Sequence, residues 1–125
     1  MLLNRIVTFL LTKDPAVCIP FYRDLLGFTF LRDDGFALVF DLHGTPLRIS
    51  KVPDVQPAQH TVLGWEVEDI HSTVTELASR GLAFTRYPNM GQDEHGICTF
   101  PTGDKVAWFQ DPDGNTLSLS QHAAL

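Results

Sequence analysis

The stretch that decides the fold runs from Trp108 to Gln121 and reads WFQDPDGNTLSLSQ. It begins with aromatic residues, passes through DPDGN, whose Asp, Pro and Gly residues are typical of a tight turn, and ends in alternating apolar and polar side chains. We therefore expect two antiparallel strands joined by this turn. In the second strand Ser118 and Ser120 alternate with Leu117 and Leu119, so its polar face offers hydroxyl groups and no carboxylate.

The composition of the chain fits one globular domain covering residues 1–125. Of the 125 residues, 44% are hydrophobic and only 19% are charged, which is typical of a chain that buries an apolar core. The net charge of −6, with no run of Lys or Arg, argues against nucleic acid and against an anionic membrane surface as partners. No apolar run is as long as a membrane span, and Cys18 and Cys98 form no metal-binding motif, so we expect reduced thiols in a cytoplasmic protein.

The first half of the chain has the order strand, helix, three strands. Residues 5–12 are rich in β-branched and aromatic side chains and predict a strand. A helix follows, with Asp14 expected as its N-cap and Gly27 just past its C-terminus. Pro20 is expected to kink this helix or loosen its first turn, because proline lacks the backbone N–H. Turn signals then divide residues 28–50 into three short strands.

The same order repeats in the second half. Residues 61–68 predict a strand, Asp69 is expected to cap a helix that Gly81 ends, and three further strands are expected within residues 82–120. The two halves thus indicate an internal duplication of a βαβββ unit. The expected organisation is module one at about residues 1–52, a linker at 53–59 and module two at about 60–121.

The order of elements and three sequence stretches resemble the vicinal oxygen chelate superfamily, which includes glyoxalase I, bleomycin-resistance proteins and extradiol dioxygenases. The stretches are FYRDLLGF (21–28), VEDIHSTVTELASRGLAF (67–84) and WFQDPDGNTLSLSQ (108–121). The resemblance implies an α+β fold in which two βαβββ modules form a curled mixed sheet, a half-open barrel with a central cavity, and it implies a homodimer. Because this fold hosts both enzymes and simple binders, it does not settle the function.

The resemblance also implies positions for metal ligands, on the first and last strands of each module. Val7, Val62 and Ser118 stand at three of these positions, and the fourth falls within residues 48–50, which contain no His, Asp or Glu. Such side chains cannot hold a divalent ion, so we expect no metal and no cofactor. A shift of two residues would put His60 in place of Val62, but one imidazole makes no chelate.

The candidate ligand-binding residues are polar or aromatic side chains expected on or beside the cavity. They are Phe9, Arg48, Ser50, Glu66, Tyr87, His95, Trp108 and Ser118. Arg48 offers a planar fork for a carboxylate or phosphate if its strand register points it inward, and is a surface arginine if not. Trp108 could stack on a flat ligand or belong to the core. Residues 87–96 could form a lid over the cavity or a plain solvated loop.

Three functions remain open from the sequence. The first is a protein of the bleomycin-resistance style that binds a small organic molecule without a catalytic metal. The second is an enzyme, either a metal-dependent lyase or dioxygenase with displaced ligands from His60, Glu66, Glu94 and His95, or a metal-free isomerase with Glu66 as its base. The third is a scaffold or regulatory dimer whose cavity is filled by side chains. No catalytic residue can be assigned.

Overall fold

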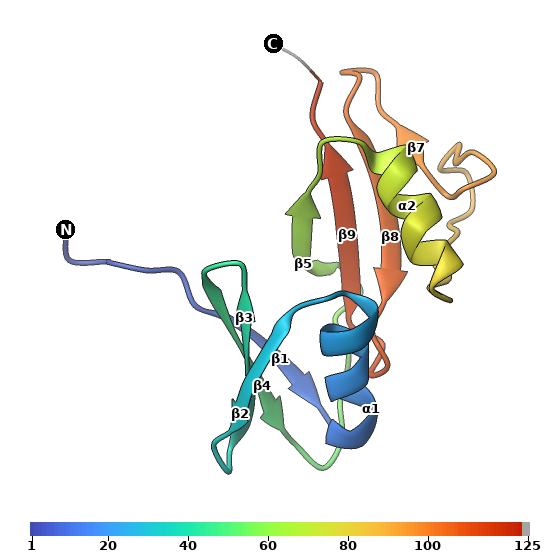
Figure 1. Cartoon of the computed structure of the whole chain (residues 1–125). Helices are drawn as coiled ribbons and strands as arrows, with labels where there is room; N and C mark the ends of the chain where they lie inside the picture. Colours follow the sequence, from blue (N-terminus) through green and yellow to red (C-terminus); the bar gives the residue numbers. More distant parts are fainter. Residues whose placement is uncertain (124–125) are drawn as a thin grey trace. The chain divides into compact units, whose positions relative to one another are not determined.

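A computed structural model describes residues 1–123 and divides into two compact units (Figure 1). Unit one comprises residues 1–57 together with 111–115, and unit two comprises residues 58–110 together with the chain from Thr116 onward. Each unit contains one mixed sheet and one short helical region. The predicted α+β class is therefore confirmed.

Unit one contains a four-stranded sheet in the order β1-β4-β3-β2. The strands are β1 (Thr8–Thr12), β2 (Thr29–Asp33), β3 (Ala37–Leu42) and β4 (Thr45–Lys51). β1 runs parallel to β4, and the other neighbours are antiparallel. Leu47 and Ile49 are fully buried, whereas Arg48 between them is only half-buried. Side chains alternate across a strand, so β4 has one fully buried face and one more open face, whereas β3 beside it is buried on both faces.

The helical region of unit one is irregular at the position that Pro20 predicts. An α-helix, α1 (Pro15–Pro20), passes directly into a π-helical segment, Phe21–Leu25, whose wider turn is closed by the Leu26 N–H donating to the Phe21 carbonyl at 3.0 Å. Asp14 occupies the N-cap position as predicted, but its side chain makes no capping hydrogen bond. Instead the Asp14 carbonyl accepts the N–H groups of Val17 and Cys18.

Unit two contains a five-stranded sheet in the order β5-β9-β8-β6, with β7 also paired to β8. Its elements are β5 (Thr61–Glu66), α2 (Ile70–Ser79), β6 (Phe84–Thr85), β7 (Cys98–Thr99), β8 (Lys105–Gln110) and β9 (Thr116–Gln121). The prediction that Asp69 caps its helix is confirmed, because its Oδ1 accepts the Ser72 N–H at 3.2 Å. The strands expected around 82–86 and 97–100 are only two residues long each, since a long loop separates them.

The DPDGN turn joins β8 to β9 as predicted, but its residues belong to unit one. The Asp111 carboxylate is buried there, and its Oδ2 accepts the Tyr22 hydroxyl at 2.6 Å and the Asn115 Nδ2 at 2.8 Å. The Asn115 amide also donates to the Leu11 carbonyl at 3.2 Å, and the Lys13 N–H donates to Asp113 Oδ1 at 2.9 Å. The turn is therefore fixed by partners about a hundred residues earlier in the chain.

No helix within residues 1–123 is both long and apolar enough to cross a membrane.

Candidate ligand-binding site

The open face of the unit-two sheet brings together two of the predicted site residues. Trp108 of β8 lies in register with Ser118 of β9, and Ser118 lies in register with Gly64 of β5. A Cβ atom at Gly64 would lie only 2.5 Å from Ser118 Oγ, so only glycine lets the serine sit this close to β5. The neighbouring residues Phe109 and Leu117 point to the opposite face and are fully buried. Trp108 and Ser118 therefore lie side by side outside the core.

Tyr87 stands at the edge of this face and meets Trp108. The two ring centroids are 5.4 Å apart and the rings are nearly perpendicular, at 87°, an edge-to-face arrangement. The rings border an open depression of about 430 Å³ whose lining is aromatic, apolar or neutral polar. The lining residues are Gln59, His60, Thr61, Tyr87, Pro88, Met90, Trp108 and Thr116. Such a surface suits a flat organic molecule better than an ion.

A glutamine inside the loop holds Tyr87 in place. Gln92 Oε1 accepts the Tyr87 N–H at 2.7 Å. The Gln92 amide nitrogen donates to the carbonyls of Thr85 at 2.9 Å and Gly96 at 2.8 Å, which ties the two ends of the loop together. The loop wall of the depression is thus built around one side chain, and residues 87–96 are more than a plain solvated connection.

Two other predicted residues of unit two lie away from the depression. His95 is not one of its lining residues and instead packs against His71 of α2, with ring centroids 4.7 Å apart. Glu66 is exposed at the far end of β5, where it borders a second, polar hollow with Val67, Glu68, Gln121 and His122. A role for Glu66 as general base required a partly buried carboxylate, and Glu66 is exposed.

The unit-one candidates share the open face of their own sheet. Phe9 of β1 lies in register with Arg48 of β4, and Leu11 lies in register with Ser50. Phe9 is exposed to 64% and the strand neighbours of Arg48 are buried, so Arg48 faces outward from the core of unit one on the same side as Phe9. The structure thus settles which face of the sheet carries Arg48, and its role in ligand binding stays a prediction.

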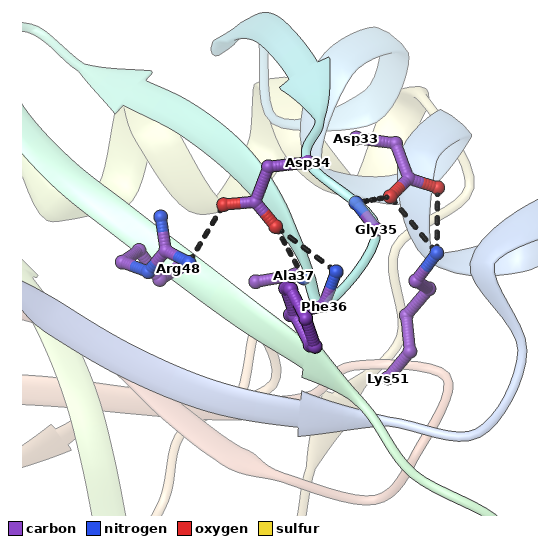
Figure 2. Close-up of polar contacts among 7 residues, drawn as sticks. All are labelled: Asp33, Asp34, Gly35, Phe36, Ala37, Arg48 and Lys51. Atoms are coloured by element: carbon purple, nitrogen blue, oxygen red, sulfur yellow. Dashed lines mark hydrogen bonds and ion pairs between the residues drawn. The ribbon is translucent and has the colours of Figure 1, made fainter.

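The guanidinium of Arg48 is nevertheless already paired. Figure 2 shows Arg48 Nη2 donating to Asp34 Oδ2, at 2.7 Å, and Lys51 bound to Asp33 at 2.8 Å. The backbone N–H of Ala37, then Arg48, then the N–H of Phe36 hold the pKa of the Asp34 carboxyl well below its usual range. An incoming anion would have to compete with a carboxylate that is fixed by three hydrogen bonds.

The side chains do not fit the divalent ion that the family resemblance implies. Within residues 1–123, no group of three or more His, Cys, Asp or Glu side chains is arranged to hold a metal. The displaced ligands considered from sequence are also scattered: His60 precedes β5 and Glu66 ends it, which separates their backbones by roughly 16 Å or more. Glu94 and His95 lie in a third place, in the loop before β7.

Sequence reasoning missed much of the lining of the depression. His60 was considered only as a metal ligand, and Gln59, Thr61, Pro88, Met90 and Thr116 were not singled out. Pro88 and Met90 could have been found, since they follow Tyr87 directly in the same loop. Gln59 and Thr116 could not, because nothing local indicates that the start of β5 and the start of β9 border one hollow.

Comparisons with known proteins agree with this architecture. A family model of the Glyoxalase/Bleomycin resistance protein/Dioxygenase superfamily matches residues 3–119. The sequence matches none of the curated proteins. One similar solved structure is TnmS3, an antibiotic binding protein from Streptomyces sp. CB03234, at 23% identity and a TM-score of 0.72, covering 98% of this chain and 99% of that one.

Two further structures carry the superfamily description. A glyoxalase/bleomycin resistance protein/dioxygenase from Nocardioides is 17% identical with a TM-score of 0.72, covering 95% of this chain and 83% of that one. A superfamily member from Sphaerobacter thermophilus DSM 20745 is 21% identical with a TM-score of 0.73, covering 96% and 98%. At these identities the likeness concerns the fold.

Proposed function

The chain belongs to the Glyoxalase/Bleomycin resistance protein/Dioxygenase superfamily, and from this premise we propose that it binds a small, flat organic molecule without using a metal ion. The observation that carries the proposal is the pair formed by Tyr87 and Trp108 at the edge of the depression in unit two. The exposed ring surface of this pair gives a planar ligand something to stack on.

The polar groups beside the two rings support selective binding. His60, Thr61 and Gln59 line the same depression and supply hydrogen-bond donors and acceptors. Aromatic and apolar side chains together with a few polar groups are the usual lining of a site for a small organic molecule. TnmS3, which shares the fold, is described as an antibiotic binding protein, and this supports binding as the activity to test first.

The experiment is a binding screen with planar aromatic antibiotics, read out by melting temperature and by tryptophan fluorescence. We expect a saturable shift for at least one compound, and we expect Trp108→Ala to weaken its affinity more than tenfold, as loss of a central aromatic contact does. Trp65→Phe is the matched control, because Trp65 stacks on Phe109 at 6.3 Å on the other face of the sheet. The proposal is abandoned if no compound binds, or if the two variants lose affinity equally.

We also propose that the protein works as a cytoplasmic homodimer. The dimer rests on the family resemblance, and the location is supported by Cys18 and Cys98, which are both buried and unpaired. Sedimentation equilibrium of the full chain over a range of concentrations tests the dimer. A single species with the 14.0 kDa mass of one chain at every concentration would refute it.

A further inference from the structure

We infer that His71 and His95 form a binding site for a divalent transition-metal ion such as Cu²⁺, Ni²⁺ or Zn²⁺, outside the depression. The two residues come from different elements of unit two: His71 is the second residue of α2, and His95 lies in the loop between β6 and β7. Their rings meet edge to face, with centroids 4.7 Å apart and an angle of 88° between the ring planes. Imidazole nitrogen is the ligand that these ions share.

The spacing of the rings agrees with shared coordination. Two imidazoles that bind one tetrahedral ion at a metal–nitrogen distance of about 2.0–2.1 Å have their ring centroids about 5 Å apart. The observed 4.7 Å is close to this separation. His71 is exposed and the His95 side chain is exposed to 33%, so an ion and its water molecules can reach both rings.

The charge around the two rings favours a cation. Glu94 Oε1 lies 3.5 Å from His95 Nε2, and Asp93 Oδ1 accepts the His95 N–H at 2.8 Å. Asp93 Oδ1 also accepts the Ile97 N–H at 2.9 Å, which holds this carboxylate beside His95. These carboxylates offset the positive end of the α2 helix dipole near His71.

The site has two protein ligands, and water fills the other positions. This agrees with the absence, among residues 1–123, of any group of three or more donors arranged to hold an ion. Such a site is neither structural nor catalytic in the usual sense, since those hold an ion by three or four side chains. Its effect is to fasten the loop that carries Tyr87, Pro88 and Met90 to α2, which stiffens one wall of the depression.

The test uses tag-free protein, with no organic ligand present, titrated with NiCl₂, CuCl₂ or ZnCl₂ in a calorimeter. We expect one ion to bind per chain at about pH 7.5. His71→Asn and His95→Asn should each weaken binding at least tenfold. His43→Asn and His122→Asn are the controls, since neither residue lies in α2 or in the loop between β6 and β7.

Two structural readouts accompany the titration. Ni²⁺ or Cu²⁺ should broaden the amide NMR signals around residues 71 and 95 before those around residues 43 and 122, and Zn²⁺ should slow amide exchange in residues 88–96. The inference fails if wild-type protein binds none of the three ions, if the control variants lose binding equally, or if broadening starts elsewhere. Because the readouts need no organic ligand, failure here leaves the proposed binding function standing, and failure of the ligand screen leaves the metal site standing.

Discussion

The two units build the same kind of helix start in different ways. In both, an aspartate directly precedes the helix, yet only Asp69 of unit two uses its carboxylate as a cap. In unit one, the helical region is instead fixed from its far end, where the Tyr22 hydroxyl donates to Asp111, 89 residues away in sequence. An aspartate before the helix thus forms a capping hydrogen bond in unit two, whereas in unit one a hydrogen bond between residues distant in sequence fixes the helical region instead.

The open faces of the two sheets differ in the same manner. On unit one, the cation that could attract a ligand, Arg48, is held by Asp34. On unit two, the Tyr87–Trp108 pair borders a depression whose lining contains no acidic or basic residue other than His60. As they stand, neither face is suited to binding an anion, so the search for a ligand begins with unit two.

The largest effect is expected from Asp111→Ala in unit one. This carboxylate accepts four hydrogen bonds, from the Tyr22 hydroxyl, the Asn115 amide and the backbone N–H groups of Asp113 and Asn115. Removing it leaves buried donors unsatisfied, so we expect the free energy of unfolding to fall by about 3 kcal/mol. Urea denaturation followed by circular dichroism measures this.

Tyr22→Phe is the graded control for that experiment. It removes one of the four hydrogen bonds and keeps the ring, which packs on Phe40 at 5.6 Å, so we expect a loss of about 1 kcal/mol. Equal losses in the two variants would show that the hydrogen bond from the Tyr22 hydroxyl alone accounts for the effect of the Asp111 carboxylate.

A smaller effect is expected when the two helix starts are compared directly. Asp69→Ala removes a side chain that accepts the Ser72 N–H and hydroxyl, so we expect a measurable fall in melting temperature. Asp14→Ala removes a side chain without a capping hydrogen bond, so we expect a clearly smaller fall. Calorimetry of both variants measures the two melting temperatures. A larger fall for Asp14→Ala than for Asp69→Ala would contradict the contrast between the units.

The pKa values of Asp69 and Asp111 are also expected to be shifted in opposite directions. Burial raises the pKa of Asp111, against hydrogen bonds that lower it, whereas bonds from the Ser72 hydroxyl and N–H lower the pKa of Asp69. The contribution of Asp69 to stability is present above its unfolded pKa and is lost as the pH falls through its folded pKa. The contribution of Asp111 to stability has the opposite pH dependence. It increases as the pH falls from the pKa of Asp111 in the folded state to its lower pKa in the unfolded state, because the native state binds the proton more tightly.

Carboxyl-carbon NMR measures both titrations in one sample. We expect the Asp111 resonance to titrate above that of an ordinary aspartate and the Asp69 resonance below it. Midpoints in the reverse order would mean that the hydrogen bonds to Asp111 outweigh its burial.

The smallest effect is expected from Arg48→Gln. Since Asp34 already holds the guanidinium, this change should alter the affinity of a ligand bound in unit two by less than about twofold. Asp34→Asn sharpens the comparison, because it frees Arg48 and should make unit one attract small carboxylates that the wild-type protein does not bind. Titration with acetate or benzoate, followed by NMR shifts around residue 48, tests this, and a shift in wild-type protein would show that Asp34 does not block the arginine.

Much of the fold follows from local sequence. The DPDGN turn, the alternation of LSLS after it and the Asp69 cap were each predicted, because turn chemistry, strand period and capping depend on residues within a few positions of one another. The site was less predictable. Trp108 and Ser118 were chosen on a strand whose alternation fixes their face, whereas His95 was assigned to the cavity and lies against α2 instead, because a loop carries no period from which its direction could be inferred.

By itself, then, the sequence determined the order of elements, the family and which strand residues share a face. Only the tertiary structure decided that Asp111 is bound by Tyr22, that Arg48 is paired with Asp34 and that Tyr87 meets Trp108. The physical reason is that hydrogen bonds and ring contacts form between side chains that chain folding brings within a few ångströms. The side chains in these pairs are 14 to 89 residues apart in sequence, so no pattern within a few neighbouring residues predicts the pairing.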